Sequence, residues 1–178
     1  MRRPLKIGIV VGVALVALAL AGFARMLRRG FSAHDEPTAI EAFAARTIRS
    51  WAVPADLRGA ENPLPLTPAV VTDARAHWAD HCAVCHGNDG KGRTTIGGHL
   101  YPRAPDMTLP ATQELTDGEL FAIIENGIRL TGMPGWGNGT AESGYGSWSL
   151  VHFIRRLPRL TPEEIAGMEA EAEFLSGH

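Results

Sequence analysis

The two cysteines of the chain lie close together in the segment DHCAVCHGNDGKG at residues 80–92, and a histidine follows the second. Cys82, Cys85 and His86 could serve four kinds of site. A disulfide between cysteines this close strains the bond geometry, and a thioredoxin-like dithiol expects a βαβ setting that the sequence does not show. A zinc site commonly takes four protein ligands, often as two spaced pairs, whereas only one pair is present. Cys-x-x-Cys-His is the signature of covalent haem attachment of c type, and this interpretation fits best.

The spacing of the motif has a physical reason under this interpretation. Two thiols on one turn of backbone can each bond a vinyl group on adjacent pyrroles of a haem. The residue after the second thiol then directs its imidazole at the iron from below the ring. We therefore predict that Cys82 and Cys85 are tethers and that His86 is the proximal iron ligand.

A haem iron in an electron carrier commonly has a sixth ligand, and Met133 is the methionine best placed to provide it. It lies in the segment TGMPGW, a constrained loop between two predicted helices. Gly132 lets the chain approach the ring closely, and Pro134 fixes the backbone just after the methionine. The other methionines belong to the N-terminal apolar segment, the proline-rich loop or the last helix: Met1, Met26, Met107 and Met168.

An apolar segment begins the chain and predicts a membrane anchor. Residues 7–23 read IGIVVGVALVALALAGF and contain no charge. A bilayer core needs about 20 apolar residues, with roughly 17 as the lower limit. A cleaved signal peptide is the alternative, since 19–21 fits the small-x-small cleavage pattern. The length of the run favours an uncleaved anchor. Three basic residues lie on each side, so charge does not fix its orientation.

The rest of the chain is predicted to be mostly helical. Apolar residues recur at helical spacing in several segments, and no alternating strand pattern of useful length is present. We expect helices within 34–51, from 67 into the cysteine motif, within 115–129, within 147–157 and from 161 onward. The expected N-terminal caps are Asp35 or Glu36, Thr67 followed by Pro68, Thr116 with Glu119 as a capping box, and Thr161. Residues 87–110 and 131–146 are expected to be loops.

The charge distribution excludes one class of partner. The first thirty residues hold six of the 17 basic residues and no acidic one, so residues 31–178 carry 11 basic and 19 acidic groups. A net charge of −8 on this part has the wrong sign for binding nucleic acid. It would favour docking to a basic protein surface.

Residues from about Val71 to Leu157 resemble a monohaem class I cytochrome c. The matching features are the helix ARAHWADHCAVCHG, the proline-rich loop YPRAPDM, the helix DGELFAIIENGI, the loop TGMPGW and the helix LVHFIRRL. The resemblance implies an all-α class I cytochrome c fold around one covalently bound haem c with its iron. It also implies that His86 and Met133 are the axial ligands.

The resemblance implies two further features. A backbone carbonyl of the proline-rich loop should accept the second N–H of the His86 imidazole, with Pro105 as first candidate and Pro102 as second. The first helix of the domain should also pack across the last. This crossing would bring Ala74 and Trp78 into contact with Phe153, Ile154 and Leu157.

The expected function is electron transfer and not enzymatic catalysis, since an iron with both axial positions filled leaves no place for a substrate. Haem attachment of this type belongs to the outer side of the bacterial cytoplasmic (inner) membrane, so the soluble domain should face the periplasm. Its partners would be redox proteins of the bacterial respiratory chain.

The chain is expected to have four parts. They are an anchor at 1–30, an extra helix and linker at 31–66, the haem domain at 67–160 and an acidic helix at 161–178.

Two alternatives stay open. The protein could be a fixed haem subunit of a larger oxidoreductase complex, with the 36–51 helix as its contact. It could instead bind a gas or peroxide, if Met133 is labile. A bis-histidine site would require one of four other histidines as the sixth ligand: His77, His81, His99 or His152.

We predict that the mature protein retains the N-terminal anchor. N-terminal sequencing of protein extracted from membranes by detergent should return residues from the start of the chain. A mature protein that begins just after residue 21 would show that the apolar segment is a cleaved signal peptide.

Overall fold

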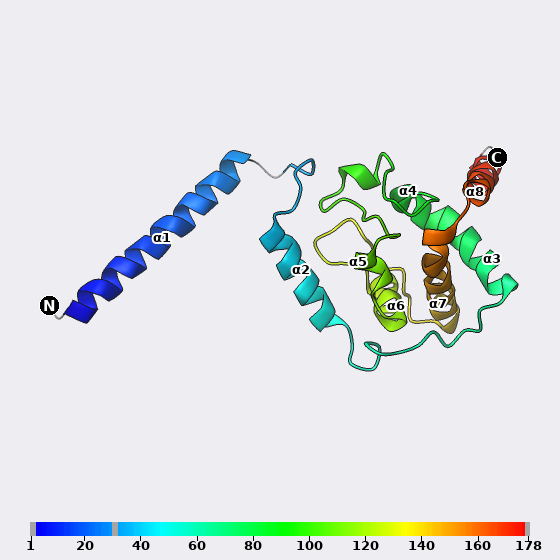
Figure 1. Cartoon of the computed structure of the whole chain (residues 1–178), viewed down its shortest axis with the longest axis horizontal. Coiled ribbons are helices and arrows are strands. Elements are labelled where there is room, and N and C mark those ends of the chain that lie inside the picture. Colours follow the sequence, from blue (N-terminus) through cyan, green and yellow to red (C-terminus); the bar gives the residue numbers. More distant parts are fainter. Residues whose placement is uncertain (1–2, 30–31, 177–178) are drawn as a thin grey trace. The chain divides into compact units, whose positions relative to one another are not determined.

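The computed structural model describes residues 3–29 and 32–176, and these residues contain helices and no strand (Figure 1). This confirms the predicted all-α fold. The chain divides into two compact units, residues 1–35 and 36–178.

The first unit contains one long helix, α1 (Arg3–Arg29). Its segment Pro4–Arg28 is long and apolar enough to cross a membrane, and none of it is buried within the structure. An N-terminal signal sequence has the same length and composition, so the helix supports membrane anchoring only weakly.

The second unit contains seven α-helices among its described residues. They are α2 (Ala39–Ala52), α3 (Pro68–His77), α4 (Ala83–His86), α5 (Pro110–Gln113), α6 (Asp117–Asn126), α7 (Ala141–Arg156) and α8 (Pro162–Ser176). A π-helical turn, Trp78–Cys82, joins α3 to α4, and short 3-10 turns follow at Gly97–His99 and Leu157–Arg159.

Three predicted helix starts are confirmed by the capping contacts. Thr67 caps α3 with Pro68 in its first turn, Thr116 forms a capping box with Glu119 at the start of α6, and Thr161 exchanges the same two hydrogen bonds with Glu164 at the start of α8. In each case the hydroxyl accepts a hydrogen bond from a backbone N–H that has no partner within the helix.

Two other predicted starts are wrong. Helix α2 is capped by Thr38 in a capping box with Glu41, and not by Asp35 or Glu36. The threonine and the glutamate satisfy two backbone donors reciprocally, which one acidic residue further upstream cannot do. Helix α7 begins at Ala141, inside the segment predicted to be a loop, because Thr140 accepts a hydrogen bond from the backbone N–H of Ser143.

The core forms where α3 crosses α7, as the resemblance implied. Ala74 is fully buried, and the rings of Trp78 and Phe153 lie 5.4 Å apart between centroids. Met168 of α8 is also fully buried and closes one side of this cluster. The remaining fully or nearly buried members are Met107, Leu120, Ile124, Leu150, Val151, Ile154 and Leu157. The crossing fixes the approach to the cysteine motif, since Trp78 is the first residue of the π-helical turn that ends at Cys82.

The segment between α2 and α3 is held against the haem domain. The amide of Asn62 donates to the carbonyl of Trp148 at 2.8 Å, and Nε2 of His152 lies 2.8 Å from the carbonyl oxygen of Leu64. A side chain at Gly118 would clash with the carbonyl oxygen of Leu57. The segment therefore packs tightly on α6 and α7, and it keeps α2 within the second unit.

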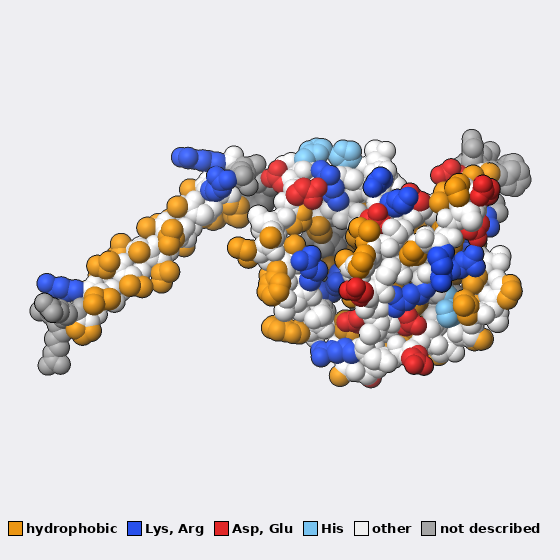
Figure 2. Space-filling view, in the orientation of Figure 1, with side chains coloured by type: hydrophobic (Ala, Val, Ile, Leu, Met, Phe, Trp, Pro, Cys, Tyr) orange, Lys and Arg blue, Asp and Glu red, His pale blue; other side chains and the backbone are white. Residues whose placement is uncertain are grey.

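Helix α2 turns its apolar stripe outward. Its inward side carries the half-buried Ala42 and Arg49, followed by the buried Val53. Figure 2 shows hydrophobic side chains gathered over the outer side of this helix. The exposed large members of the stripe are Ile40, Phe43, Ile48 and Trp51. The stripe itself therefore makes no core with the haem domain.

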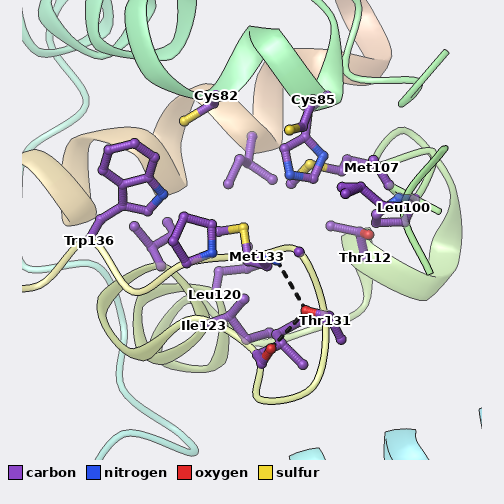
Figure 3. Close-up of a pocket in the computed structure, with 18 of the residues that line it drawn as sticks. Cys82, Cys85, Leu100, Met107, Thr112, Leu120, Ile123, Thr131, Met133 and Trp136 are labelled. Atoms are coloured by element: carbon purple, nitrogen blue, oxygen red, sulfur yellow. Dashed lines mark hydrogen bonds between the residues drawn. The ribbon is translucent and has the colours of Figure 1, made fainter. Parts of the chain in front are cut away.

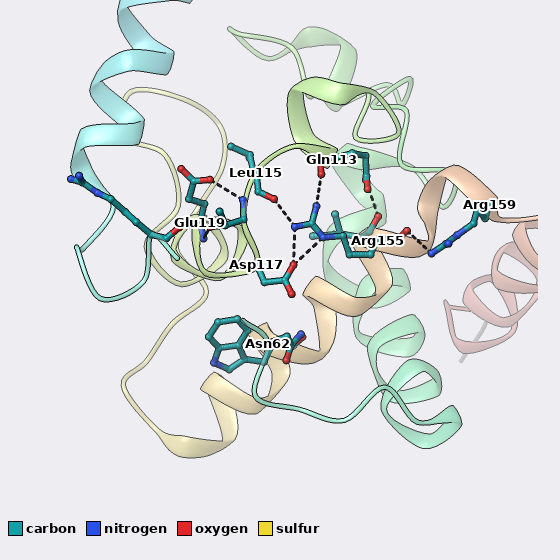
Figure 4. Close-up of polar contacts among 11 residues, drawn as sticks. Asn62, Gln113, Leu115, Asp117, Glu119, Arg155 and Arg159 are labelled. Atoms are coloured by element: carbon teal, nitrogen blue, oxygen red, sulfur yellow. Dashed lines mark hydrogen bonds and ion pairs between the residues drawn. The ribbon is translucent and has the colours of Figure 1, made fainter. Parts of the chain in front are cut away.

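Arg155 links α7 to the segment that joins α5 and α6 (Figure 4). Its guanidinium donates to the carbonyl oxygens of Gln113 and Leu115 and to the carboxylate of Asp117, the last at 2.7 and 3.0 Å. Gln113 continues the network by donating to the carbonyl of Met107 at 2.7 Å. One side chain thus satisfies acceptors on three half-buried residues.

We predict that Arg155→Gln lowers the free energy of unfolding by about 2–3 kcal/mol, because it leaves a carboxylate and two carbonyls without their donor. Chemical denaturation of the mature protein measures this loss. Arg156→Gln on the same helix is the control. Its partner Glu164 is at 2.7 Å, but both side chains are more than a third exposed, so solvent screens the pair and the loss should be clearly smaller than in Arg155→Gln. Equal losses in the two variants would contradict the role given to Arg155.

Candidate haem site

A mostly apolar cavity of about 390 Å³ opens between the cysteine motif, the proline-rich loop, α6 and the 131–136 loop. Figure 3 shows the thiols of Cys82 and Cys85 along one side of it, across from Leu120 and Ile123. The sulfur of Met133 points into the same space. His86 also lines the cavity. The structure therefore brings all four predicted haem-binding side chains to one cavity.

The turn that carries the thiols is held by Trp78. The indole N–H donates to the carbonyl of Gly87 at 3.0 Å, and the indole ring lies 5.8 Å from the imidazole of His86. Gly87 ends α4 with φ of +74°, a conformation that a glycine adopts without strain. The buried tryptophan thus fixes both ends of the motif relative to the α3–α7 core.

A second support comes from the turn that begins at Thr94. Its hydroxyl lies 2.8 Å from the carbonyl oxygen of Val84 and 3.1 Å from that of Cys85, and it accepts from the N–H of Gly97 at 2.8 Å. A side chain at Gly97 would overlap the carbonyl oxygen of Cys85. Only glycine allows this turn to approach the cysteine motif so closely.

The two thiols are free and half-buried. Burial raises the pKa of Cys82 to about 12, and the neighbouring Cys85 contributes in the same direction. Cys82 is therefore a protonated thiol near neutral pH, and the structure contains no disulfide between the pair.

His86 is held as a neutral imidazole, because burial lowers its pKa. Its Nδ1 is buried and has no hydrogen-bond partner among the described residues. Pro105 and Pro102 both line the cavity, but neither carbonyl accepts a hydrogen bond from this ring in the structure, so the predicted acceptor stays a prediction. A buried nitrogen without a partner is costly, and the predicted loop carbonyl would supply the acceptor that this nitrogen lacks.

The loop that carries Met133 is pinned to the end of α6. The N–H of Ile128 donates to the carbonyl of Met133 at 3.1 Å, and the N–H of Met133 donates to the hydroxyl of Thr131 at 3.1 Å. Gly127, with φ of +65°, leaves no space for a side chain against the backbone of residues 133–135. The thioether is therefore presented by a fixed backbone.

The other ligand candidates have different surroundings. Met107 is buried in the core and also lines the cavity. His81 lines the cavity beside Trp136, with ring centroids 5.2 Å apart. Four other ligand candidates do not line the cavity: His77, His99, His152 and Met168. Tyr145 does not line it either.

Sequence reasoning missed four residues that belong to this site. Thr94 and Gly97 support the cysteine motif, and Arg49 and Arg103 line the cavity. These residues form no short sequence pattern with the cysteine motif, so the sequence alone could not predict that they contact the site.

The cavity fits a haem attached through two thioether bonds. It has apolar walls, two adjacent thiols, a neutral imidazole beside them and a thioether pointing inward. The helical fold and this site define a class I c-type cytochrome.

Comparison with known families agrees with this assignment. Residues 69–154 match the family described as cytochrome C oxidase, cbb3-type, subunit III, and this match supports a class I c-type cytochrome domain over these residues. Such a domain binds haem c covalently, with its iron, and acts in electron transport. No curated protein matches the chain.

We predict that Gly97→Ala lowers the haem content per polypeptide severalfold, because the added methyl group displaces the backbone of Cys85. The haem content follows from the absorbance of the pyridine adduct divided by the polypeptide concentration. Gly98→Ala is the matched control, since no atom beyond the two neighbouring residues lies within 4 Å of a methyl group at that position. A normal haem content in both variants would show that the turn does not position the cysteine motif.

Proposed function

We propose that the protein carries single electrons through a haem whose iron is bound by His86 and Met133. The observation that supports this most is the pinned loop of Met133, which directs its sulfur into the cavity lined by His86. A methionine that merely filled space would not need a backbone fixed at Gly127 and Ile128.

The haem supplies reversible one-electron chemistry at its iron when bound. The residues of this chain decide what else can happen there. His86 and Met133 would both bind the iron, which would leave no position for oxygen or a substrate. The thioether favours the reduced state relative to a second nitrogen ligand. The apolar walls limit the access of water.

The proposal places this domain at the periplasmic face of the bacterial cytoplasmic membrane, held by α1. The support is the apolar length of α1 and the general location of c-type haem attachment. A tethered carrier meets membrane-bound redox partners at a high effective concentration, so strong binding is unnecessary. The net negative charge after residue 30 suits a basic partner surface.

A second candidate is a fixed haem subunit of a larger oxidoreductase complex. The description of the matched family names an oxidase subunit, and the outward apolar stripe of α2 offers a surface for a permanent contact. Purification in mild detergent separates the two candidates. A fixed subunit returns with stoichiometric partners, whereas a mobile carrier returns alone.

We predict that Met133→Ala removes the far-red sulfur-to-iron band of the oxidised protein and allows the reduced protein to bind carbon monoxide at neutral pH. The reason is the loss of the sixth ligand. Absorption spectra of the purified protein in both oxidation states measure the two effects.

Met107→Leu is the control, because Met107 also lines the cavity but belongs to the buried core. This variant should keep the far-red band and should not bind carbon monoxide. Loss of the band in Met107→Leu, with retention in Met133→Ala, would transfer the ligand role to Met107. Binding of carbon monoxide by the unmodified protein would favour a gas-binding or peroxide-binding function.

A further inference from the structure

The charged side chains of the cavity wall are unbalanced. Among the described residues that line it, Arg49 and Arg103 are the only arginines or lysines, and no aspartate or glutamate is present. The two arginines come from different parts of the chain. Arg103 lies in the proline-rich loop, within the matched residues 69–154, whereas Arg49 lies in α2, outside them. An apolar cavity with a positive edge is suited to an apolar ligand that carries carboxylates.

The two arginines differ in their partners. Arg103 forms an ion pair with Glu36 at 3.0 Å. Arg49 forms no hydrogen bond or ion pair with any residue in the described parts of the chain, although its side chain is half-buried. Burial lowers the pKa of Arg49, while the charge of Glu119 opposes that shift. The guanidinium therefore has five N–H donors available to water or to a ligand at the edge of the cavity.

Glu119 does not supply the missing acceptor. Its carboxylate accepts from the backbone N–H of Thr116 at 2.8 Å and so completes the capping box of α6. Arg49 lines the same cavity as two residues of α6, Leu120 and Ile123. These two residues form the cavity wall across from the thiols (Figure 3).

The haem itself carries carboxylates on the corresponding side. Its two propionates extend from the edge opposite the vinyl groups that bond to cysteines. Attachment at Cys82 and Cys85 therefore directs the propionates away from the thiol side of the cavity. We propose that Arg49 binds a haem propionate, so that α2 is part of the haem site. This inference rests on the haem domain but not on which residue is the sixth ligand.

The packing of α2 agrees with this role. Glu36, just before the helix, pairs with Arg103 of the cavity wall, and Glu41 in its first turn lies 3.4 Å from the hydroxyl of Tyr101. The helix is thus held beside the proline-rich loop by polar contacts while its apolar stripe faces outward.

Arg49→Gln in the full-length haem protein tests the proposal. Removing a positive charge beside a propionate favours the oxidised iron, so the equilibrium constant for reduction should fall by roughly threefold to tenfold, as expected for one charge in a partly buried site. Arg46→Gln is the matched control, since Arg46 is an exposed residue of the same helix and does not line the cavity. Its change should stay below about twofold because solvent and salt screen exposed charges.

The propionate bending band in the resonance Raman spectrum reports the contact itself. It should shift in Arg49→Gln and stay in place in Arg46→Gln. An unshifted band in Arg49→Gln overturns the proposal whatever the equilibrium constant does. If Arg49→Gln does not accumulate with haem, Arg49→Lys decides by the same band, since lysine keeps the charge but not the planar fork. The far-red sulfur-to-iron band should persist in every variant, so a failure here is distinguishable from a failure of the proposed His86–Met133 ligation.

Discussion

The structure depends on one geometric constraint: two thiols and an imidazole must leave a single short turn and face the same cavity. Contacts from two sides hold this turn in place. The crossing of α3 and α7 buries Trp78, and its indole N–H closes the turn at Gly87. From the other side, Thr94 and Gly97 press against the carbonyl of Cys85. The remaining helices then need only to enclose the space that this turn faces.

The size of that space links folding to the cofactor. The cavity is open to solvent, and its walls are mostly apolar. A haem bound there would remove these walls from water, and the burial of apolar surface stabilises a fold. The haem would therefore contribute to the stability of the fold as well as to its chemistry. Protein and cofactor are best regarded as one folding unit.

Local patterns in the sequence predicted most of this fold, because the decisive signals lie within a few residues of each other. The cysteine motif, the start of α3 at Thr67 and the capping box at Thr116 are of this kind. Helix α7 was predicted too short because glycines outweighed the capping signal of Thr140. The place of Arg49 in the cavity wall could not be predicted from the sequence. It depends on α2 packing beside residues far away in the sequence, with its apolar stripe facing solvent. The axial ligation by His86 and Met133 remains a prediction that the cavity supports.

The mass of the mature protein, made with its native maturation machinery, tests the central claim most directly. The account predicts a mass equal to the polypeptide plus one haem, and a single proteolytic peptide spanning residues 82–86 that carries the haem through both cysteines. A mass equal to the polypeptide alone, with Cys82 and Cys85 both open to alkylation after unfolding, would contradict it.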